Sequence, residues 1–265
     1  YKYLLLLQTG RFSLGKLRRM EKLLYEVSLK GDVKSLKKIL NLDRRLRLED
    51  VALTSFLRTP LHIAAVHGHI KFAKAILDMK KVLTTVRDSQ GLTPLHLASA
   101  TGETEMVKLL LKANVDACTI QDQDGRTPMH LAAMKDEVSI LKLLIERRPE
   151  AVHLMTDRNE TVLHYCVKNR SFEALKFLLE YQIGAQPTDR NVMSVNSRDD
   201  AGNTILHIAA ETRNMKIMGY LVSNKHIKVE INAFNNNSDK AFDMLSQTER
   251  NDLEFGVSDS YGSAN

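Results

Sequence analysis

The chain has 265 residues, of which 43% are hydrophobic, so it can bury a core of substantial size. Its formal charge of +6 is concentrated at one end: residues 1–50 carry 13 Lys and Arg against 6 Asp and Glu, whereas residues 51–265 carry 25 against 26. A nucleic-acid-binding surface needs a clustered basic face, so this balance predicts no nucleic-acid partner. Two cysteines, Cys118 and Cys166, are too few for a disulfide framework and suit a reducing compartment, which predicts an intracellular, cytoplasmic location.

The first 57 residues contain two segments of different character. Residues 1–19 have no acidic residue and only a short apolar run, Leu4–Leu7, which cannot span a membrane. We expect 1–19 to be a disordered leader or a non-native segment, although their Arg content also resembles a transit peptide. Residues 20–57 begin with a helix–Gly–helix pattern whose outer face is rich in Lys, as the polar end of a repeat array requires. We therefore predict an N-terminal capping repeat at 20–57.

A seven-residue motif then recurs along the chain. It reads TPLHIAA from Thr59, TPLHLAS from Thr93, TPMHLAA from Thr127, TVLHYCV from Thr161 and TILHIAA from Thr204. The intervals are 34, 34, 34 and 43 residues. A nearly fixed period of this size indicates a repeat array, in which stacked neighbours create the core that no single unit can form. We assign residues 58–238 to five repeats.

Each repeat has the pattern of two helices and a tight loop. The Thr is an expected helix N-cap, and Pro60, Pro94 and Pro128 follow at the first helical position, where proline is tolerated. The second helix has apolar residues at helical spacing, such as Val107 and Leu110. A polar segment with Asp and either Gly or Asn leads to the next Thr, which predicts a tight turn.

The turn between the two helices of a repeat changes residue type along the chain. Early repeats have glycine there and later ones do not, the residues being Gly31, Gly68, Gly102, Asp136, Arg170 and Arg213. If this position needs positive φ, a side chain there costs about 1–2 kcal/mol. We therefore expect the C-terminal repeats to be locally less stable.

The C-terminal part departs from the regular period in three places. The 43-residue interval predicts an insertion at 181–195, which we expect to be a surface loop, although such insertions sometimes carry function. Residues 239–255 follow an Asn cluster without the motif, which predicts a C-terminal capping repeat. Residues 256–265 are polar and contain glycine, which predicts a disordered tail.

The order TPLHxAA, Gly, VxxLL, Asp, Gly over residues 20–250 resembles the ankyrin repeat. This resemblance implies an all-α solenoid of helix-turn-helix units with short β-hairpin loops, which holds another protein. The stretches ERRPEAVHLMTDRNETVLHYCV (146–167) and INAFNNNSDKAFDML (231–245) resemble plant ankyrin proteins of immune signalling. Full-length members of that group carry a C-terminal membrane domain with a Pro-Gly-Gly motif, which this sequence lacks, so the chain is either truncated or a soluble relative. The narrower resemblance implies signalling in plant defence, at the cytosolic face of the plasma membrane if such a domain follows.

The sequence offers no catalytic or metal-binding motif. It contains no phosphate-binding Gly-rich loop, HExxH, CxxC or GxSxG. Stacked helices lie about 8–10 Å apart, whereas zinc ligands converge to about 2 Å from one ion, so a row of one His per repeat cannot bind a metal. The resemblance instead implies a structural role for the motif residues Thr59, His62, Thr93, His96, Thr127, His130, Thr161, His164, Thr204 and His207. We predict that the protein is not an enzyme and has no cofactor.

Residues outside the repeated framework are free to specify a partner protein. The resemblance places them on hairpin tips and at the ends of first helices, the candidates being Arg87, Gln90, Leu92, Gln121, Gln123, Arg126, Met134, Lys135, Arg158, Lys168, Arg198 and Arg213. Arg and Met are enriched in interface cores and Lys is depleted, so we expect a central patch of Arg126, Met134 and Arg158 with Lys135 and Lys168 at its rim. We expect a monomeric adaptor or scaffold without membrane insertion by this segment. The alternative is the regulatory ankyrin portion of a larger membrane protein, kinase or channel.

Overall fold

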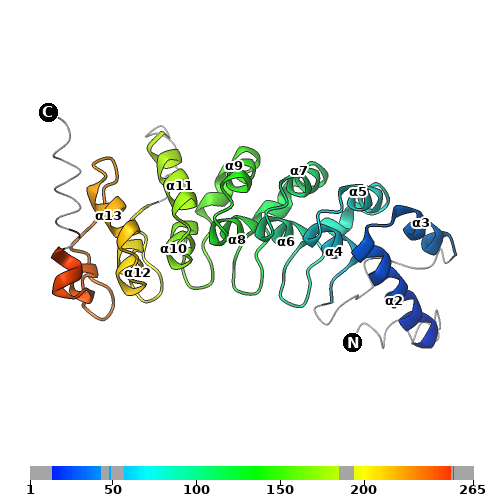
Figure 1. Ribbon diagram of the computed structural model, residues 1–265, viewed down its shortest axis with the longest axis horizontal. Helices are drawn as coiled ribbons and strands as arrows, with labels where there is room; N and C mark the ends of the chain where they lie inside the picture. The colour runs from blue at the N-terminus through cyan, green and yellow to red at the C-terminus, as the bar shows by residue number, and fades with distance from the viewer. Residues whose placement is uncertain (1–13, 43–47, 49–56, 185–193, 252, 254–265) are drawn as a thin grey trace. The chain divides into compact units, whose positions relative to one another are not determined.

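The computed structural model describes residues 14–42, 48, 57–184, 194–251 and 253. The chain divides into two compact units, Tyr1–Gln123 (unit 1) and Asp124–Asn265 (unit 2). Each unit is a stack of helix pairs (Figure 1). The fold is therefore all-α, as the periodic motif predicts.

The helix pairs of unit 1 are α2 (Leu14–Lys30) with α3 (Val33–Leu42), α4 (Pro60–Val66) with α5 (Ile70–Met79), and α6 (Pro94–Ala100) with α7 (Thr104–Ala113). The 3₁₀ helices η1 (Lys81–Thr84) and η2 (Val115–Thr119) follow α5 and α7. Helix α4 packs between α2 and α6, and α5 packs between α3 and α7. The first helices of the pairs thus form one row and the second helices another.

The helix pairs of unit 2 are α8 (Pro128–Met134) with α9 (Val138–Arg147), α10 (Val162–Lys168) with α11 (Phe172–Gly184), and α12 (Ile205–Glu211) with α13 (Met215–Ser223). The 3₁₀ helices are η3 (Pro149–His153) and η4 (Ala241–Met244). Helix α10 packs between α8 and α12, α11 packs on α9, and η4 packs on α12. The 3₁₀ helix η4 thus covers the end of the first-helix row.

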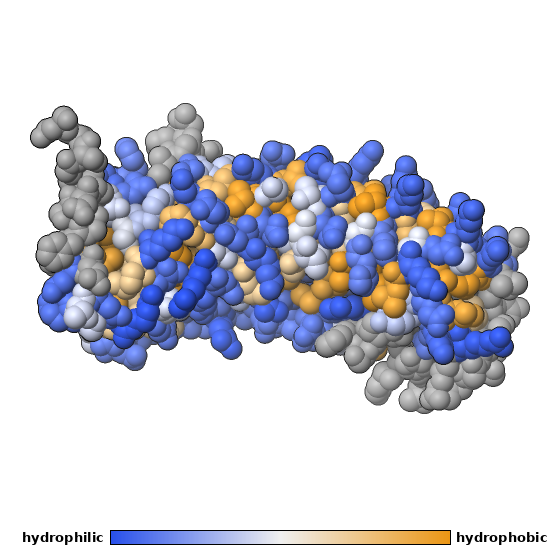
Figure 2. Space-filling model, viewed as in Figure 1, coloured by the Kyte–Doolittle hydropathy of each residue, from blue (hydrophilic) through white to orange (hydrophobic). Residues whose placement is uncertain are grey.

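Apolar side chains of neighbouring helices fill the interior of each unit. Fully buried examples are Leu61, Ile76, Leu95 and Leu110 in unit 1 and Leu144, Leu163, Leu178 and Leu206 in unit 2. Hydrophilic side chains project from the second helices and from the loops (Figure 2). This division follows from the motif, because only stacked neighbours cover the apolar faces of such short helices.

The structure places the start of the first helix earlier than the predicted repeat boundary. Helix α2 begins at Leu14, so residues 14–19 of the expected leader are helical. The apolar spacing of Leu14, Leu17 and Met20 extends the helical pattern upstream, which accounts for this start. Residues 1–13, the 185–193 part of the expected insertion, and 254–265 lie outside the described residues.

The loops between repeats are tight turns rather than paired strands. In the loop before α6, the backbone N–H of Asp88 donates to the carbonyl oxygen of Leu92 at 2.8 Å. Gly91 has a φ of 78°, and an added Cβ would lie 2.7 Å from a backbone nitrogen of the next loop, so glycine is required there. The described residues form no β-strand, and an isolated bridge joins Phe234 to Lys240. The expected β-hairpin loops keep the turn but are too short for a strand ladder.

A buried Thr–His pair begins the first helix of each repeat. At α4, the backbone N–H of Thr59 donates to Nδ1 of His62 at 3.2 Å, and Thr59 Oγ1 lies 2.8 Å from the same nitrogen. Because Nδ1 accepts this bond, the proton of the neutral ring is assigned to Nε2, which lies 3.0 Å from the carbonyl oxygen of Leu92. His62 therefore connects the start of its own helix to the loop that precedes the next helix pair.

Unit 2 repeats this arrangement. The backbone N–H of Thr161 donates to Nδ1 of His164 at 3.1 Å, and Nε2 of His164 lies 3.2 Å from the carbonyl oxygen of Asn203. Nε2 of His207 lies 3.1 Å from the carbonyl oxygen of Asp239. Burial lowers the pKa of His62 to about 4, and burial also lowers the pKa of His164. These two rings are therefore neutral in the folded protein at neutral pH.

The turn between paired helices has positive φ whether or not it contains glycine. The φ values are 64° at Gly31 and Gly68, 78° at Gly102, 60° at Asp136, 58° at Arg170 and 52° at Arg213. Each non-glycine side chain also forms a hydrogen bond to the following repeat. These bonds join the backbone N–H of Ala174 to Asp136 Oδ1 (2.6 Å), Arg170 to the carbonyl oxygen of Thr212 (2.8 Å), and Arg213 to that of Met244 (2.6 Å). They offset part of the backbone cost, and the lower stability of these repeats stays a prediction.

Replacing His62 with Gln is expected to weaken the pH dependence of stability. The pKa of His62 is about 4 in the folded chain, against about 6.5 when unfolded. The neutral ring therefore contributes its full stabilisation above about pH 6.5, and this contribution is lost as the pH falls from about 6.5 towards about 4. Near pH 5 the loss in unfolding free energy is about 2 kcal/mol. Denaturant unfolding near pH 7 and pH 5 should show the stability gap between the native chain and His62→Gln narrowing by this amount. An equal gap at both pH values would contradict a buried neutral ring.

Two substitutions at Arg170 separate the backbone cost from the hydrogen bond. Arg170→Gly and Arg170→Ala both remove the bond to Thr212, but only alanine keeps a Cβ at positive φ. Because that conformation disfavours any L-residue, we expect the Gly variant to be more stable than the Ala variant by about 1 kcal/mol. Denaturant titration of both variants measures this difference. Equal stabilities would show that the turn carries no strain.

Candidate partner-binding site

The loops of unit 2 form a hydrogen-bonded row. The backbone N–H of Asp157 donates to the carbonyl oxygen of Asp124 at 3.3 Å, and the backbone N–H of Asp200 donates to that of Arg158 at 3.1 Å. The side-chain amide of Asn159 donates to Asp200 Oδ1 at 2.6 Å. Successive loops therefore hold one another in place, so their exposed side chains project from an ordered edge.

Three predicted residues lie at the α8 end of this row. Arg126 is half-buried, and its guanidinium lies 2.9 Å from the carboxylate of Asp124 in the same loop. Met134, the last residue of α8, is half-buried, and Lys135 follows it as an exposed C-cap. This end therefore offers a partner the partly accessible thioether of Met134 and the ammonium group of Lys135. The carboxylate of Asp124 partly neutralises the charge of Arg126.

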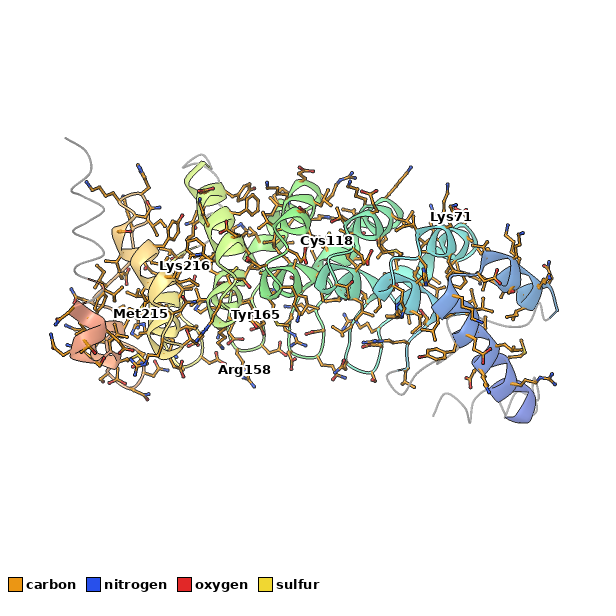
Figure 3. All side chains as sticks on the ribbon, in the orientation of Figure 1. Lys71, Cys118, Arg158, Tyr165, Met215 and Lys216 are labelled. Carbon is orange, nitrogen blue, oxygen red and sulfur yellow. The ribbon has the colours of Figure 1, made fainter. Side chains whose placement is uncertain are left out.

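The loop that leads into α10 carries an exposed cation of the predicted patch. Arg158 is exposed at the tip of this loop (Figure 3), and in the part of the chain that the structure describes its guanidinium forms no ion pair. Lys168, at the end of α10, instead pairs with the carboxylate of Glu160, which is only 4% exposed. Glu160 thus neutralises the cation that we expected at the rim, while Arg158 keeps its charge for a ligand.

Tyr165 is a candidate that the sequence analysis missed. It lies on α10 (Figure 3) and is half-buried, with its ring edge-on to that of His130 at a centroid distance of 5.3 Å. The equivalent position in other repeats holds an aliphatic residue that is almost fully buried, such as Leu131 and Ile208. The signal was present in the sequence, because TVLHYCV is the one motif copy with an aromatic residue at this position.

The other predicted residues of unit 2 have structural partners. Arg198 is exposed, and its guanidinium donates to the carbonyl oxygen of Phe234 at 2.8 Å. Arg213 lies in the turn between α12 and α13. Its guanidinium donates to the carbonyl oxygen of Met244 and lies 3.0 Å from the carboxylate of Glu249. Both side chains therefore stabilise neighbouring segments, which leaves them poorly suited to the centre of an interface.

The predicted residues of unit 1 do not form a comparable patch. The side chain of Leu92 is 8% exposed and its carbonyl oxygen lies 3.0 Å from Nε2 of His62, so the structure gives it a framework role and little surface to offer a partner. Gln123 is exposed but donates to the carbonyl oxygen of Ser89 at 2.7 Å. Arg87 and Gln90 are exposed and Gln121 is half-buried. The sequence pattern located the loops correctly but could not show which side chains turn inwards.

The buried motif residues have little catalytic capacity. Burial raises the pKa of the Cys166 thiol well above its ordinary value, so this residue is a poor nucleophile at neutral pH. The neutral His164 beside it in sequence is committed to Thr161 and Asn203. Within the described ranges, the structure has no group of three or more His, Cys, Asp or Glu that could hold a metal ion. No described helix is both long and apolar enough to cross a bilayer.

Comparison with known proteins identifies the repeat. The family described as "Ankyrin repeats (3 copies)" matches residues 23–119, 115–191 and 150–235. No curated protein matches the chain. Ankyrin repeats are in general protein–protein interaction modules, which agrees with a site made of loop tips and helix ends rather than a closed pocket. The matched ranges span most of the sequence, and the chain therefore belongs to the ankyrin-repeat family.

Proposed function

We propose that this chain is a non-catalytic adaptor or scaffold that binds a partner protein on the loop and first-helix face of unit 2. The observation that carries the proposal is Arg158, an exposed guanidinium without an ion pair among the described residues, on a loop held by hydrogen bonds to its neighbour. Tyr165 follows on the adjacent helix and Met134 ends α8, which packs against that helix. Arg and Tyr dominate binding hot spots, and Met is enriched in interfaces.

The ordered loop row supports tight binding by a small patch. Because backbone bonds between loops already fix the backbone at Arg158, little backbone entropy is lost when a partner binds. A guanidinium binds carboxylates in a bidentate manner, so we infer that the partner presents an acidic side chain beside an apolar one. Lys135, also exposed, adds positive charge near Met134.

We further propose that the partner belongs to a signalling pathway, with plant defence as its setting. The support is the resemblance of residues 146–167 and 231–245 to plant ankyrin proteins of immune signalling. The first of these stretches contains both Arg158 and Tyr165, so it includes the centre of the proposed binding face.

Charge reversal at Arg126 and Arg158 should weaken partner capture without unfolding the chain. We expect at least a tenfold loss of the captured protein, because interface Arg residues often contribute about 2 kcal/mol or more. The double variant Lys142→Glu/Arg147→Glu is the matched control, since both residues are exposed on α9 and the change in net charge is the same. The measurement compares affinity capture from a native plant extract by the three proteins, with melting temperatures in parallel.

Each result of this comparison decides something. A protein captured by the native chain and by the α9 control, but not by Arg126→Glu/Arg158→Glu, supports the proposed face. Equal capture by all three places the binding face elsewhere. If none of the three captures any protein, the adaptor role itself is contradicted. Melting temperatures within about 3 °C of one another show that the variants remain folded.

A further inference from the structure

The outer faces of α3 and α5 in unit 1 carry a row of exposed lysines. On α3, Lys34, Lys37 and Lys38 are exposed, and on α5, Lys71 and Lys74 are exposed. Because α3 and α5 pack side by side and the spacings i, i+3 and i+4 select one helix face, these ammonium groups share one surface. Hydrophilic side chains project from the second helices of this unit, and Lys71 lies on the outer side of α5 (Figures 2 and 3). We call these five residues the lysine face.

The lysine face has few acidic neighbours. Asp78 is exposed on α5 four residues after Lys74, so it lies on the same face of that helix, and Glu26 is exposed on α2. Asp32 is half-buried at the start of α3, where its carboxylate accepts from the hydroxyl of Ser35 at 2.6 Å and from the backbone N–H groups of Lys34 and Ser35. The bonds to Ser35 and to the backbone lower the pKa of Asp32, and the charge of Lys34 lowers it further by a smaller amount. Within the described residues, the five lysines form no ion pair.

Lysines at comparable positions on other second helices have partners. On α7, Lys108 lies 2.7 Å from Glu105, and on α11, Lys176 lies 3.9 Å from Glu180. On α13, Lys216 lies 3.7 Å from the centroid of the Phe172 ring. A polar terminal repeat needs hydrophilic side chains, but α5 belongs to the second repeat and the other helices meet that need with mixed charges. The excess of lysine on this face, without ion pairs among the described residues, therefore calls for a different explanation.

Exposed apolar side chains follow these lysines in the sequence. Met79 ends α5 and is 44% exposed, and Val82 in η1 is 56% exposed. The exposed residues Lys80 and Lys81 lie between them. Flexible ammonium groups beside exposed aliphatic side chains are typical of surfaces that adsorb to the headgroup layer of a bilayer. A protein partner is less well matched, because lysine is depleted in protein interfaces and an ammonium lacks the planar fork that specifies a carboxylate.

We propose that the lysine face of unit 1 adsorbs to bilayers that carry anionic phospholipid. The ammonium groups would neutralise lipid phosphates and carboxylates, while Met79 and Val82 would contact the boundary of the acyl chains. This attraction is additive over the lysines and needs no fixed ligand geometry, which suits five long side chains on two adjacent helices. It places one face of the chain against a membrane without inserting a helix.

The test is sedimentation of the full chain with vesicles. One set contains phosphatidylcholine alone, and the other contains phosphatidylcholine with about 30 mol% phosphatidylserine. The test variant changes Lys34, Lys37, Lys38, Lys71 and Lys74 to Gln, which keeps helix propensity. The control changes the exposed residues Lys142, Lys176, Lys216, Lys225 and Lys228 of unit 2 to Gln, which removes the same charge elsewhere.

We expect the native chain and the control to bind the anionic vesicles, and the lysine-face variant to bind at least about tenfold more weakly. Binding of the native chain should also fall steeply with salt, because screening shortens the Debye length from about 10 Å at 0.1 M to about 3 Å at 1 M. Equal losses in the test variant and the control would overturn the proposal, since net charge alone would then explain binding. Absence of vesicle binding by the native chain would also overturn it. In that case, titration with duplex DNA and with an acidic peptide would show which polyanion the face binds.

Discussion

The buried histidine at the start of each of the five repeats that carry the Thr–His motif is the interaction on which the rest of the structure depends. Its Nδ1 accepts from the backbone of its own Thr, so the remaining proton is placed on Nε2 and points to the loop before the next pair, as His62 does to Leu92 and His164 to Asn203. One neutral ring thus sets the start of a helix and the position of the following loop. The same residue is needed at the same place in every repeat, which is why the motif is so easily seen in the sequence.

The parts of the fold that sequence could predict are those set by local chemistry. Thr and Pro at a helix start, apolar residues at helical spacing, and Asp with Gly in a turn each have a local cause, so the helix pairs and loops were predictable. Two features were not predicted: α2 begins at Leu14, and the described loops form no paired strands. Both depend on where a helix or strand ends, and intrinsic residue propensities locate such ends poorly. The ankyrin resemblance supplied the order of the elements but not the partners of their side chains.

The candidate site shows where sequence reasoning ends. Leu92 was assigned to the surface because it follows a loop tip. Its side chain is buried, however, and its carbonyl oxygen accepts a hydrogen bond from Nε2 of His62. Lys168 was predicted to bind the partner because it lies at a helix end, but its ammonium group forms an ion pair with the buried carboxylate of Glu160. Both outcomes depend on side-chain directions in a folded loop. Tyr165 was overlooked for the opposite reason, because a motif position was taken as framework although its residue type differs from that of the other copies.

The two proposed surfaces attract their ligands through different kinds of electrostatic interaction. The loop row of unit 2 mixes Arg with Asp and Asn, and several of these side chains already pair with one another, so an approaching partner must match a fixed pattern of charge and shape. The outer face of α3 and α5 has five exposed lysines that form no ion pair among the described residues, so its excess positive charge attracts an extended anionic surface. Patterned charge gives specificity, and unpatterned charge gives long-range attraction that salt weakens. Because the helix pairs are held by the Thr–His bonds and the apolar core, either surface can change its residues without changing the fold. This separation of folding residues from surface residues is what makes a repeated motif compatible with a specific partner.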